Sequence, residues 1–168
     1  ERLRGYRHAM RGLETAALRA LEFQGAFTEE SGFAAGQKIA SALPRPTAVF
    51  AANDSMAVGA LAAFAAAGIR VPETMSVIGF DDIPIARYVA PPLTTMRVDI
   101  AELGRRAFAL LLDIIINPTA HTARRERVAT TLVVRGSCAA AKSVSTRQTR
   151  PHRAARVPGS GREKGEVS

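Results

Sequence analysis

The chain has 168 residues, no tryptophan, one cysteine (Cys138) and a net charge of +8. This length suits one domain with its own core, and one cysteine excludes both an internal disulfide and a zinc site built from cysteines. The charge is uneven, because residues 139–168 hold seven Lys and Arg against two Glu. That segment has no hydrophobic periodicity, so we expect a disordered basic tail and not a nucleic-acid-binding module.

No stretch reaches the eighteen or so consecutive apolar residues that a membrane span needs. The first residues, ERLRGYRHAM, also lack the apolar core of a signal peptide. We therefore expect a cytoplasmic protein without a membrane partner.

Helical and extended patterns alternate along the first half of the chain. The predicted elements are, in order, helix 1–20, strand 21–27, helix 28–43, strand 47–52, helix 54–67 and strand 75–80. Short connections and this alternation predict an α/β fold, with a parallel sheet flanked by helices. A proline-rich connector, a strand at 94–98, a very apolar helix at 100–116 and a final strand at about 127–135 complete the prediction.

Polar side chains follow two of the predicted strands at the point where each strand ends. Asn53 and Asp54 follow one, and Asp81 and Asp82 follow the other. In an open parallel sheet, ligands bind outside the carboxyl ends of the strands. We interpret Asp54 as a helix cap, and we expect Asn53 and Asp81 to face a ligand rich in hydroxyl groups. A carboxylate accepts hydrogen bonds from hydroxyl groups, and an amide both donates and accepts them.

Phe27 ends an earlier predicted strand, where its ring would lie against the apolar face of a sugar or simply belong to the core. The sequence has no nucleophile elbow, no phosphate-binding glycine loop and no paired histidines at metal-ligand spacing. We therefore expect neither an enzyme nor a cofactor. We also expect no metal site at Asp81 and Asp82, because neighbouring strand residues point to opposite faces.

A segment of about seventy residues resembles the C-terminal half of lactose-repressor (LacI/GalR) family transcription regulators. The motifs that carry the resemblance are NDSMAVG, GIRVP, VIGFDD, PPLTT and a following helix that contains Leu-Gly. Three further stretches, RLRGY, GAFTEESGF and RVATTLVVRGS, extend the likeness from residue 1 to about 138. The segment 139–168 resembles nothing in the family.

The resemblance implies a periplasmic-binding-protein-like fold of type I. Residues 1–90 and 126–138 would form a nearly complete C-terminal subdomain, and 91–125 would form the crossover and a helix of an incomplete N-terminal subdomain. The family begins with a helix-turn-helix headpiece that has no counterpart in the sequence, so we expect a fragment that contacts operator DNA only through that absent part. Without its partner subdomain, helix 100–116 would expose its apolar stripe, dock elsewhere or associate with another chain.

At the matching positions, the resemblance implies that the effector binds to Arg2, Phe27, Asn53 and Asp81. Effectors in the family are mostly sugars and less often nucleobases or nucleosides. The resemblance also implies a homodimer, and the helix 54–67, which is uncharged after its first residue, is the candidate interface. Its proposed contact residues are Val58, Leu61, Ala62 and Ala65.

Two functions remain open on the sequence. One is the effector-sensing domain of a cytoplasmic transcription regulator of the repressor type. The other is a periplasmic-type sugar-binding receptor of a transport system, which shares the two-subdomain fold. The PPLTT motif that follows GFDD favours the regulator.

Overall fold

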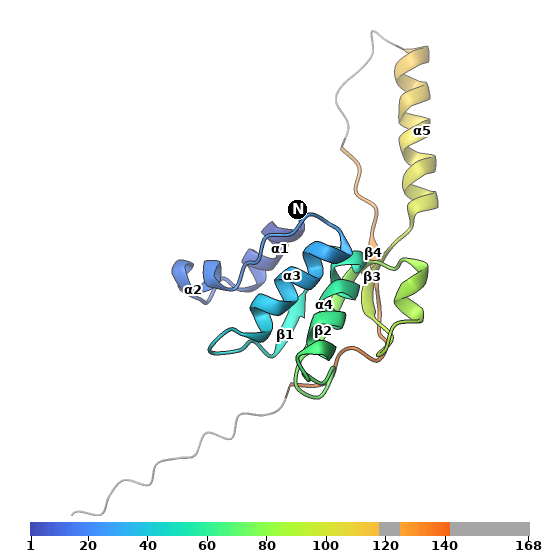
Figure 1. The fold of residues 1–168 in the computed structure, drawn as a ribbon. Helices are drawn as coiled ribbons and strands as arrows, with labels where there is room; N and C mark the ends of the chain where they lie inside the picture. The colour runs from blue at the N-terminus through green and yellow to red at the C-terminus, as the bar shows by residue number, and fades with distance from the viewer. Residues whose placement is uncertain (118–124, 142–168) are drawn as a thin grey trace, which may run out of the picture.

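The computed structural model describes residues 1–117 and 125–141. Its elements are α1 (Arg2–Ala9), α2 (Thr15–Ala20), α3 (Glu29–Ala40), β1 (Ala48–Phe50), α4 (Asp54–Ala66), β2 (Ser76–Asp81), the 3-10 helix η1 (Pro84–Arg87), β3 (Thr94–Val98), α5 (Ile100–Ile116) and β4 (Thr130–Val133). Figure 1 shows this succession along the chain. The predicted disordered tail lies, from residue 142 on, outside the described residues.

The described strands form one four-stranded sheet in the order β1-β2-β3-β4. The pairs β1–β2 and β2–β3 are parallel, with Val49 opposite Val77 and Gly79 opposite Thr95. The pair β3–β4 is antiparallel, because the chain leaves the sheet along α5 after β3 and returns in the opposite direction. The predicted α/β fold is thus confirmed, with one antiparallel strand that the sequence reading did not anticipate.

Two predictions at the start of the chain are wrong. The expected single helix over 1–20 is divided into α1 and α2 by a turn that contains Gly12, a weak helix former. Residues 21–27 are not a strand, because no neighbouring strand pairs with them in the described sheet. They remain close to β1, and Leu21 and Phe23 line a cavity together with it.

Helices α3 and α4 approach each other so closely that glycine is required at their contact. A Cβ atom on Gly59 would lie 1.9 Å from the carbonyl oxygen of Glu29, and one on Gly32 would lie 2.2 Å from that of Met56. These two backbones therefore touch directly. The contact starts beside Thr28, whose hydroxyl accepts from the Ser31 amide and caps α3.

The uncharged helix α4 is covered on two sides, as its composition predicts. One side lies against the sheet, and the other packs on α3, which supplies a partner from within the chain. Leu61 belongs to the core at 7% exposure, so it is not available as a surface contact. The other three candidate interface residues are half-buried or exposed, namely Val58, Ala62 and Ala65.

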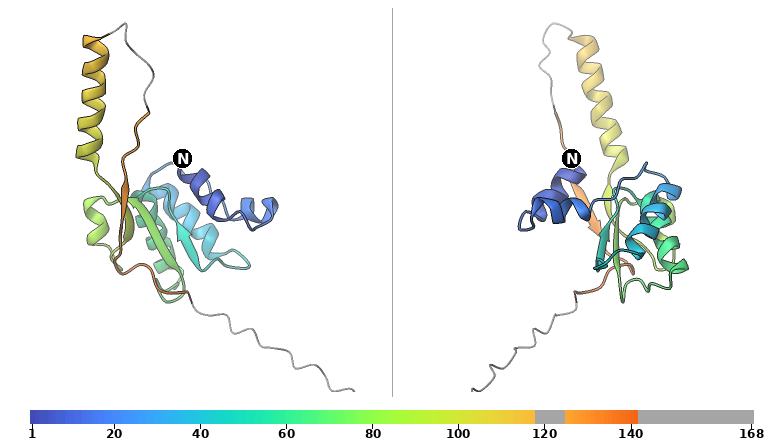
Figure 2. Two further views of the ribbon diagram at one scale, coloured as in Figure 1. Left: turned by 180° about the vertical axis from the view of Figure 1, so that it is seen from behind. Right: turned by 60° about the vertical axis from the view of Figure 1, so that its left-hand side comes forward.

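Helix α5 stands away from the rest of the described structure, as Figures 1 and 2 show from three sides. None of its residues is buried. Its large apolar side chains are exposed, including Leu103, Phe108, Leu111, Ile115 and Ile116. Of the three expected possibilities, the described single chain has the first, an exposed apolar stripe. No helix in the described part of the chain is long and apolar enough to cross a membrane.

Replacing Leu111 and Ile115 by Gln is expected to lower the binding of a hydrophobic dye strongly. These side chains are 51% and 64% exposed, so the free energy of unfolding should change by less than about 0.5 kcal/mol. As a control, Leu93→Ala removes a fully buried side chain and should cost about 2–5 kcal/mol. Dye fluorescence and urea unfolding measure both effects. A large loss of stability in the Gln variants would show that α5 is buried against a partner.

Candidate functional site

Arg2 and Asp81 meet at the carboxyl ends of the first two strands. Arg2 Nη2 lies 3.1 Å from Asp81 Oδ1, and Arg2 Nη1 donates to the carbonyl oxygen of Ala52, which follows β1. The guanidinium carbon also lies 3.9 Å from the centroid of the Phe80 ring, a cation–π contact. The side chains of Arg2 and Asp81 are each about one-third exposed. Both therefore remain accessible to a ligand.

Asn53 and Phe27 form a second pair beside the first. The Asn53 Nδ2 donates to the carbonyl oxygen of Phe27 at 2.9 Å, and its Oδ1 accepts from the amide of Met56 at 3.0 Å. Asn53 thus holds the Phe27 backbone in place, while the Phe27 side chain is 60% exposed. One Nδ2 hydrogen and one Oδ1 lone pair remain on Asn53 for a further partner. The four predicted site residues therefore lie at one edge of the sheet.

Three residues at this edge have a strained backbone. Phe27, Asp81 and Asp82 have φ values of 63°, 117° and 61°, and no other non-glycine residue of the described chain has a positive φ. Such conformations persist only where the surroundings enforce them, and they are concentrated at functional sites. Two of the three are predicted ligand contacts.

The structure corrects the interpretation of Asp54. The cap of α4 is Asn53, and Asp54 is fully buried in its first turn. Its Oδ1 accepts from the Thr95 hydroxyl at 2.6 Å, and its Oδ2 accepts from the Ile83 amide at 2.9 Å. A Cβ atom on Gly79 would lie 2.1 Å from Oδ1, so this carboxylate needs glycine beneath it. Asp54 therefore joins α4 to β2, β3 and the segment before η1.

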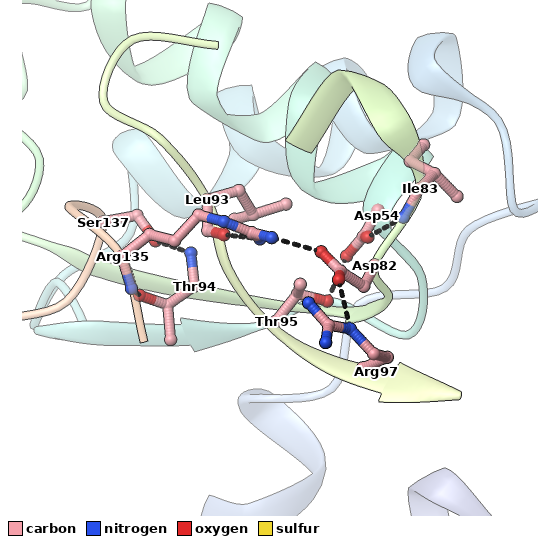
Figure 3. Close-up of polar contacts among 9 residues, drawn as sticks. All are labelled: Asp54, Asp82, Ile83, Leu93, Thr94, Thr95, Arg97, Arg135 and Ser137. Atoms are coloured by element: carbon pink, nitrogen blue, oxygen red, sulfur yellow. Dashed lines mark hydrogen bonds and ion pairs between the residues drawn. The ribbon is translucent and has the colours of Figure 1, made fainter. Parts of the chain in front are cut away.

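The side chain of Asp82 points away from Asp81 and joins β3 to the residues that follow β4. One oxygen accepts from Arg97 on β3 at 2.6 Å, and the other accepts from Arg135, after β4, at 2.5 Å. Arg135 also donates to the Leu93 carbonyl oxygen at 2.8 Å. Figure 3 shows these contacts next to those of Asp54. The sequence reading missed this cluster, because partners 15 and 53 residues away cannot be paired from local patterns.

Ser137 adds a buried crosslink on the same side. Its hydroxyl accepts from the Thr94 amide at 2.8 Å and donates to the Val77 carbonyl oxygen at 2.6 Å. Asp81 and Asp82 have separate partners, since Asp81 contacts Arg2 whereas Asp82 contacts Arg97 and Arg135. The described residues contain no group of three potential metal ligands.

The two neighbouring carboxylates have opposite pKa shifts. Burial, only partly offset by Arg2, raises the pKa of Asp81, and the negative charge of Asp54 adds to the rise. Burial alone would also raise the pKa of Asp82, but the hydrogen bonds and charges of Arg135 and Arg97 outweigh it and hold that pKa below its usual value. Asp82 is thus a firmly ionised structural group, whereas Asp81 is a less stabilised carboxylate.

The accessible space around the site is open. A cavity of about 660 Å³ lies at the ends of β2 and β3 and is lined by Asp81, Asp82, Arg87, Arg97 and Asp99 among others. Of the four predicted contacts, only Asp81 borders it, and Arg2 borders a separate cavity beside β1. The four predicted contacts therefore do not line one enclosed pocket in the described chain.

The Asp82 cluster makes stability depend on acid pH in a defined direction. Its lowered pKa means that its contribution is complete above the ordinary aspartate pKa of about 3.9 and is lost as pH falls through the folded-state value. Asp82→Asn should therefore cost roughly 2 kcal/mol near pH 7, and the difference from the parent chain should shrink at pH 3 and below.

Urea unfolding followed by circular dichroism across this pH range measures the difference. Glu73→Gln, at an exposed position, is the control and should leave the pH profile unchanged. If the Asp82→Asn difference were the same at pH 3 and pH 7, the ion pairs would have no role in stability.

Comparisons with known proteins agree with this geometry. A family described as the periplasmic binding protein-like domain matches residues 1–138. The HTH-type transcriptional repressor PurR of Klebsiella pneumoniae (strain 342) is 44% identical over 116 residues, which are 69% of this chain and 34% of the relative. PurR of Escherichia fergusonii is 45% identical over 119 residues, with the same coverage. The chain thus spans about a third of the length of the curated relatives that it matches.

Solved structures give the same result. A LacI family transcriptional regulator from Enterococcus faecium with bound ribose aligns with a TM-score of 0.64 and 32% identity, over 71% of this chain and 44% of that one. A second, from Arthrobacter sp. FB24 in complex with lactose, aligns with a TM-score of 0.61 and 33% identity, over 68% and 43%. The chain belongs to the family of periplasmic binding protein-like domains, in the form that LacI/GalR transcriptional regulators use to bind their effectors.

Proposed function

We propose that this chain is the effector-sensing part of a cytoplasmic, DNA-binding transcriptional regulator of the repressor type, and that its effector is a sugar. The observation that carries the proposal is the accessible Arg2–Asp81 pair on a strained strand end, beside the exposed ring of Phe27. The relatives are named as transcriptional repressors, and related regulators bind ribose, sucrose, glucose or lactose. Because the chain spans a third of those relatives, regulation belongs to the longer protein.

The chemistry of the site suits a polyhydroxylated ligand. A carboxylate such as Asp81 accepts hydrogen bonds from two neighbouring hydroxyl groups, and a guanidinium such as Arg2 donates to ring and hydroxyl oxygens. The exposed ring of Phe27 offers a flat apolar surface for the carbon–hydrogen face of a sugar. The free hydrogen and lone pair on Asn53 complete a mixed donor and acceptor set. No step of this recognition requires a cofactor or a reaction.

Asp82 gives ligand binding a route to the rest of the protein. It follows Asp81 directly, and its two partners, Arg97 and Arg135, lie on β3 and just after β4. A change in the Asp81 backbone is therefore transmitted to β3 and β4, the two strands on either side of α5 in the chain. The family resemblance supports the following response to the effector. Binding moves the two subdomains relative to each other, and this motion changes the affinity for operator DNA.

The assembly that we propose is a homodimer that binds operator DNA through a headpiece outside this chain. Within α4, the surface left for a dimer contact is formed by Val58, Ala62 and Ala65, since Leu61 is buried in the chain itself. The periplasmic receptor of a transport system is the alternative function. The names of the relatives favour the regulator.

Effector affinity should depend on Asp81. In a chimaera in which residues 1–138 replace the matching part of the Enterococcus faecium regulator, Asp81→Asn should weaken ribose binding. A loss of one charged hydrogen-bonding group costs about 2–4 kcal/mol, which is roughly a 30- to 1000-fold rise in Kd. The exposed Glu73→Gln variant is the matched control, and a thermal melt confirms that each chimaera is folded.

Calorimetric titration with ribose, glucose, lactose and a free nucleobase compares the ligand classes. If only the nucleobase binds, the effector belongs to the less common class in the family and is not a sugar. Unchanged sugar affinity in a folded Asp81→Asn chimaera would contradict the site.

A further inference from the structure

The backbone on both sides of Phe27 is held by one hydroxyl group, that of Ser31 in the first turn of α3. The Ser31 Oγ accepts from the amide of Ala26 at 3.0 Å and from the amide of Thr28 at 3.3 Å. The same hydroxyl donates to the Thr28 carbonyl oxygen at 2.9 Å. Three backbone groups that flank Phe27 therefore converge on a single side chain.

These contacts account for the unusual backbone conformation of Phe27. Its φ is 63°, a value that a residue with a side chain keeps only where its surroundings enforce it. Ser31 holds the amides before and after Phe27, and Asn53 Nδ2 donates to the carbonyl oxygen of Phe27 itself at 2.9 Å. Because φ sets the direction in which the side chain leaves the loop, these contacts also set the direction of the ring.

Packing does little to hold the ring of Phe27. The side chain is 60% exposed. In the described part of the chain, it belongs neither to the hydrophobic core cluster nor to the apolar residues that pack against that cluster. The orientation of the ring therefore depends on the backbone of the loop, and through it on the Ser31 hydroxyl.

We propose that Ser31 is a positioning residue of the effector site, which holds the exposed ring of Phe27 in place before the ligand arrives. The inference rests on the proposed function, because it needs Phe27 to contact the effector. Ser31 does not act as a ligand contact, since a hydroxyl group has one hydrogen and two lone pairs and all three are used within the loop. Without this hydroxyl, the ring has to be ordered when the ligand binds, which lowers the affinity.

The role of Ser31 in the loop is separable from its role at the start of α3. The cap of α3 uses a different bond, in which the Ser31 amide donates to Thr28 Oγ1 at 3.3 Å. Ser31→Ala removes the hydroxyl contacts and leaves this cap bond in place. Thr28→Val removes the cap bond, keeps a β-branched side chain and leaves the Ser31 hydroxyl in place. Thr28→Val is therefore the matched control.

The first experiment needs no ligand. The chain has no tryptophan, so Phe27→Trp introduces a single fluorescent reporter at the position of the ring. Time-resolved fluorescence anisotropy then measures the motion of this side chain on the nanosecond timescale. Adding Ser31→Ala should increase the amplitude of the fast depolarisation at least about twofold, whereas adding Thr28→Val should leave it unchanged. Circular dichroism confirms that each variant is folded.

The second experiment measures ribose affinity by calorimetric titration in the chimaera with the Enterococcus faecium regulator. Ser31→Ala should raise the Kd roughly 2- to 12-fold, as expected when one more side chain must be ordered on binding. Thr28→Val should leave the Kd unchanged. In a chimaera that already carries Phe27→Ala, Ser31→Ala should have no further effect, because the ring through which it acts is absent.

Three results would overturn the proposal. The first is equal fast depolarisation with and without the Ser31 hydroxyl in a folded chain. The second is an equal increase in the Thr28→Val control, which would assign the effect to the helix cap. The third is an unchanged effect of Ser31→Ala on the Kd after Phe27→Ala. If Phe27→Ala alone leaves ribose affinity unchanged, the proposed effector contact of Phe27 is wrong, and the fluorescence result by itself decides whether Ser31 positions the ring.

Discussion

The buried carboxylate of Asp54 is the contact on which the arrangement of the site depends. It is fully buried, yet both of its oxygens have partners, one on β3 and one in the segment that follows β2. Its position in the first turn of α4 places the negative charge at the favourable end of the helix dipole. A buried charge is tolerated only with such compensation. Gly79 completes the fit, because any side chain there would occupy the space of the carboxylate.

With Asp54 in place, the neighbouring residues take different tasks. Asn53 caps α4 and holds the Phe27 backbone. Asp81 turns towards Arg2 and the accessible edge, whereas Asp82 turns towards Arg97 and Arg135. The positive φ values of both aspartates are the backbone cost of directing two consecutive carboxylates to different places. Recognition and structural support are therefore adjacent in sequence but separate in space.

The sequence predicts the parallel core of the fold well, because strand and helix periods and short connections are local signals. Strand-end geometry also predicts that Asn53 and Asp81 lie at one edge, whereas Arg2 is placed there only by the family resemblance, and Phe27 ends a segment that is not a strand. It does not separate the roles of Asn53 and Asp54, because both residue types cap helices and only burial distinguishes them.

The features that the sequence did not predict correctly have a common physical origin. The segment 21–27 has the composition of a strand, but pairing depends on a neighbour that local sequence does not describe. The Asp82 cluster and the direction of β4 likewise depend on residues far along the chain. The exposed stripe of α5 was predictable, because this helix contains more large apolar residues than a solvent-facing helix normally has.

The most direct test of the account is a double-mutant cycle between Asp54 and Gly79. The free energy of unfolding is measured by urea denaturation at neutral pH for the parent, Asp54→Ala, Gly79→Ala and the double variant. Gly79→Ala should cost about 1–3 kcal/mol in the parent, because its Cβ meets the carboxylate. It should cost clearly less once Asp54 is alanine, because only Leu93 Cδ2, 3.0 Å from that Cβ, then remains in close contact. The coupling energy should exceed about 1 kcal/mol. Additive costs for the two substitutions would contradict a site assembled around the Asp54 carboxylate.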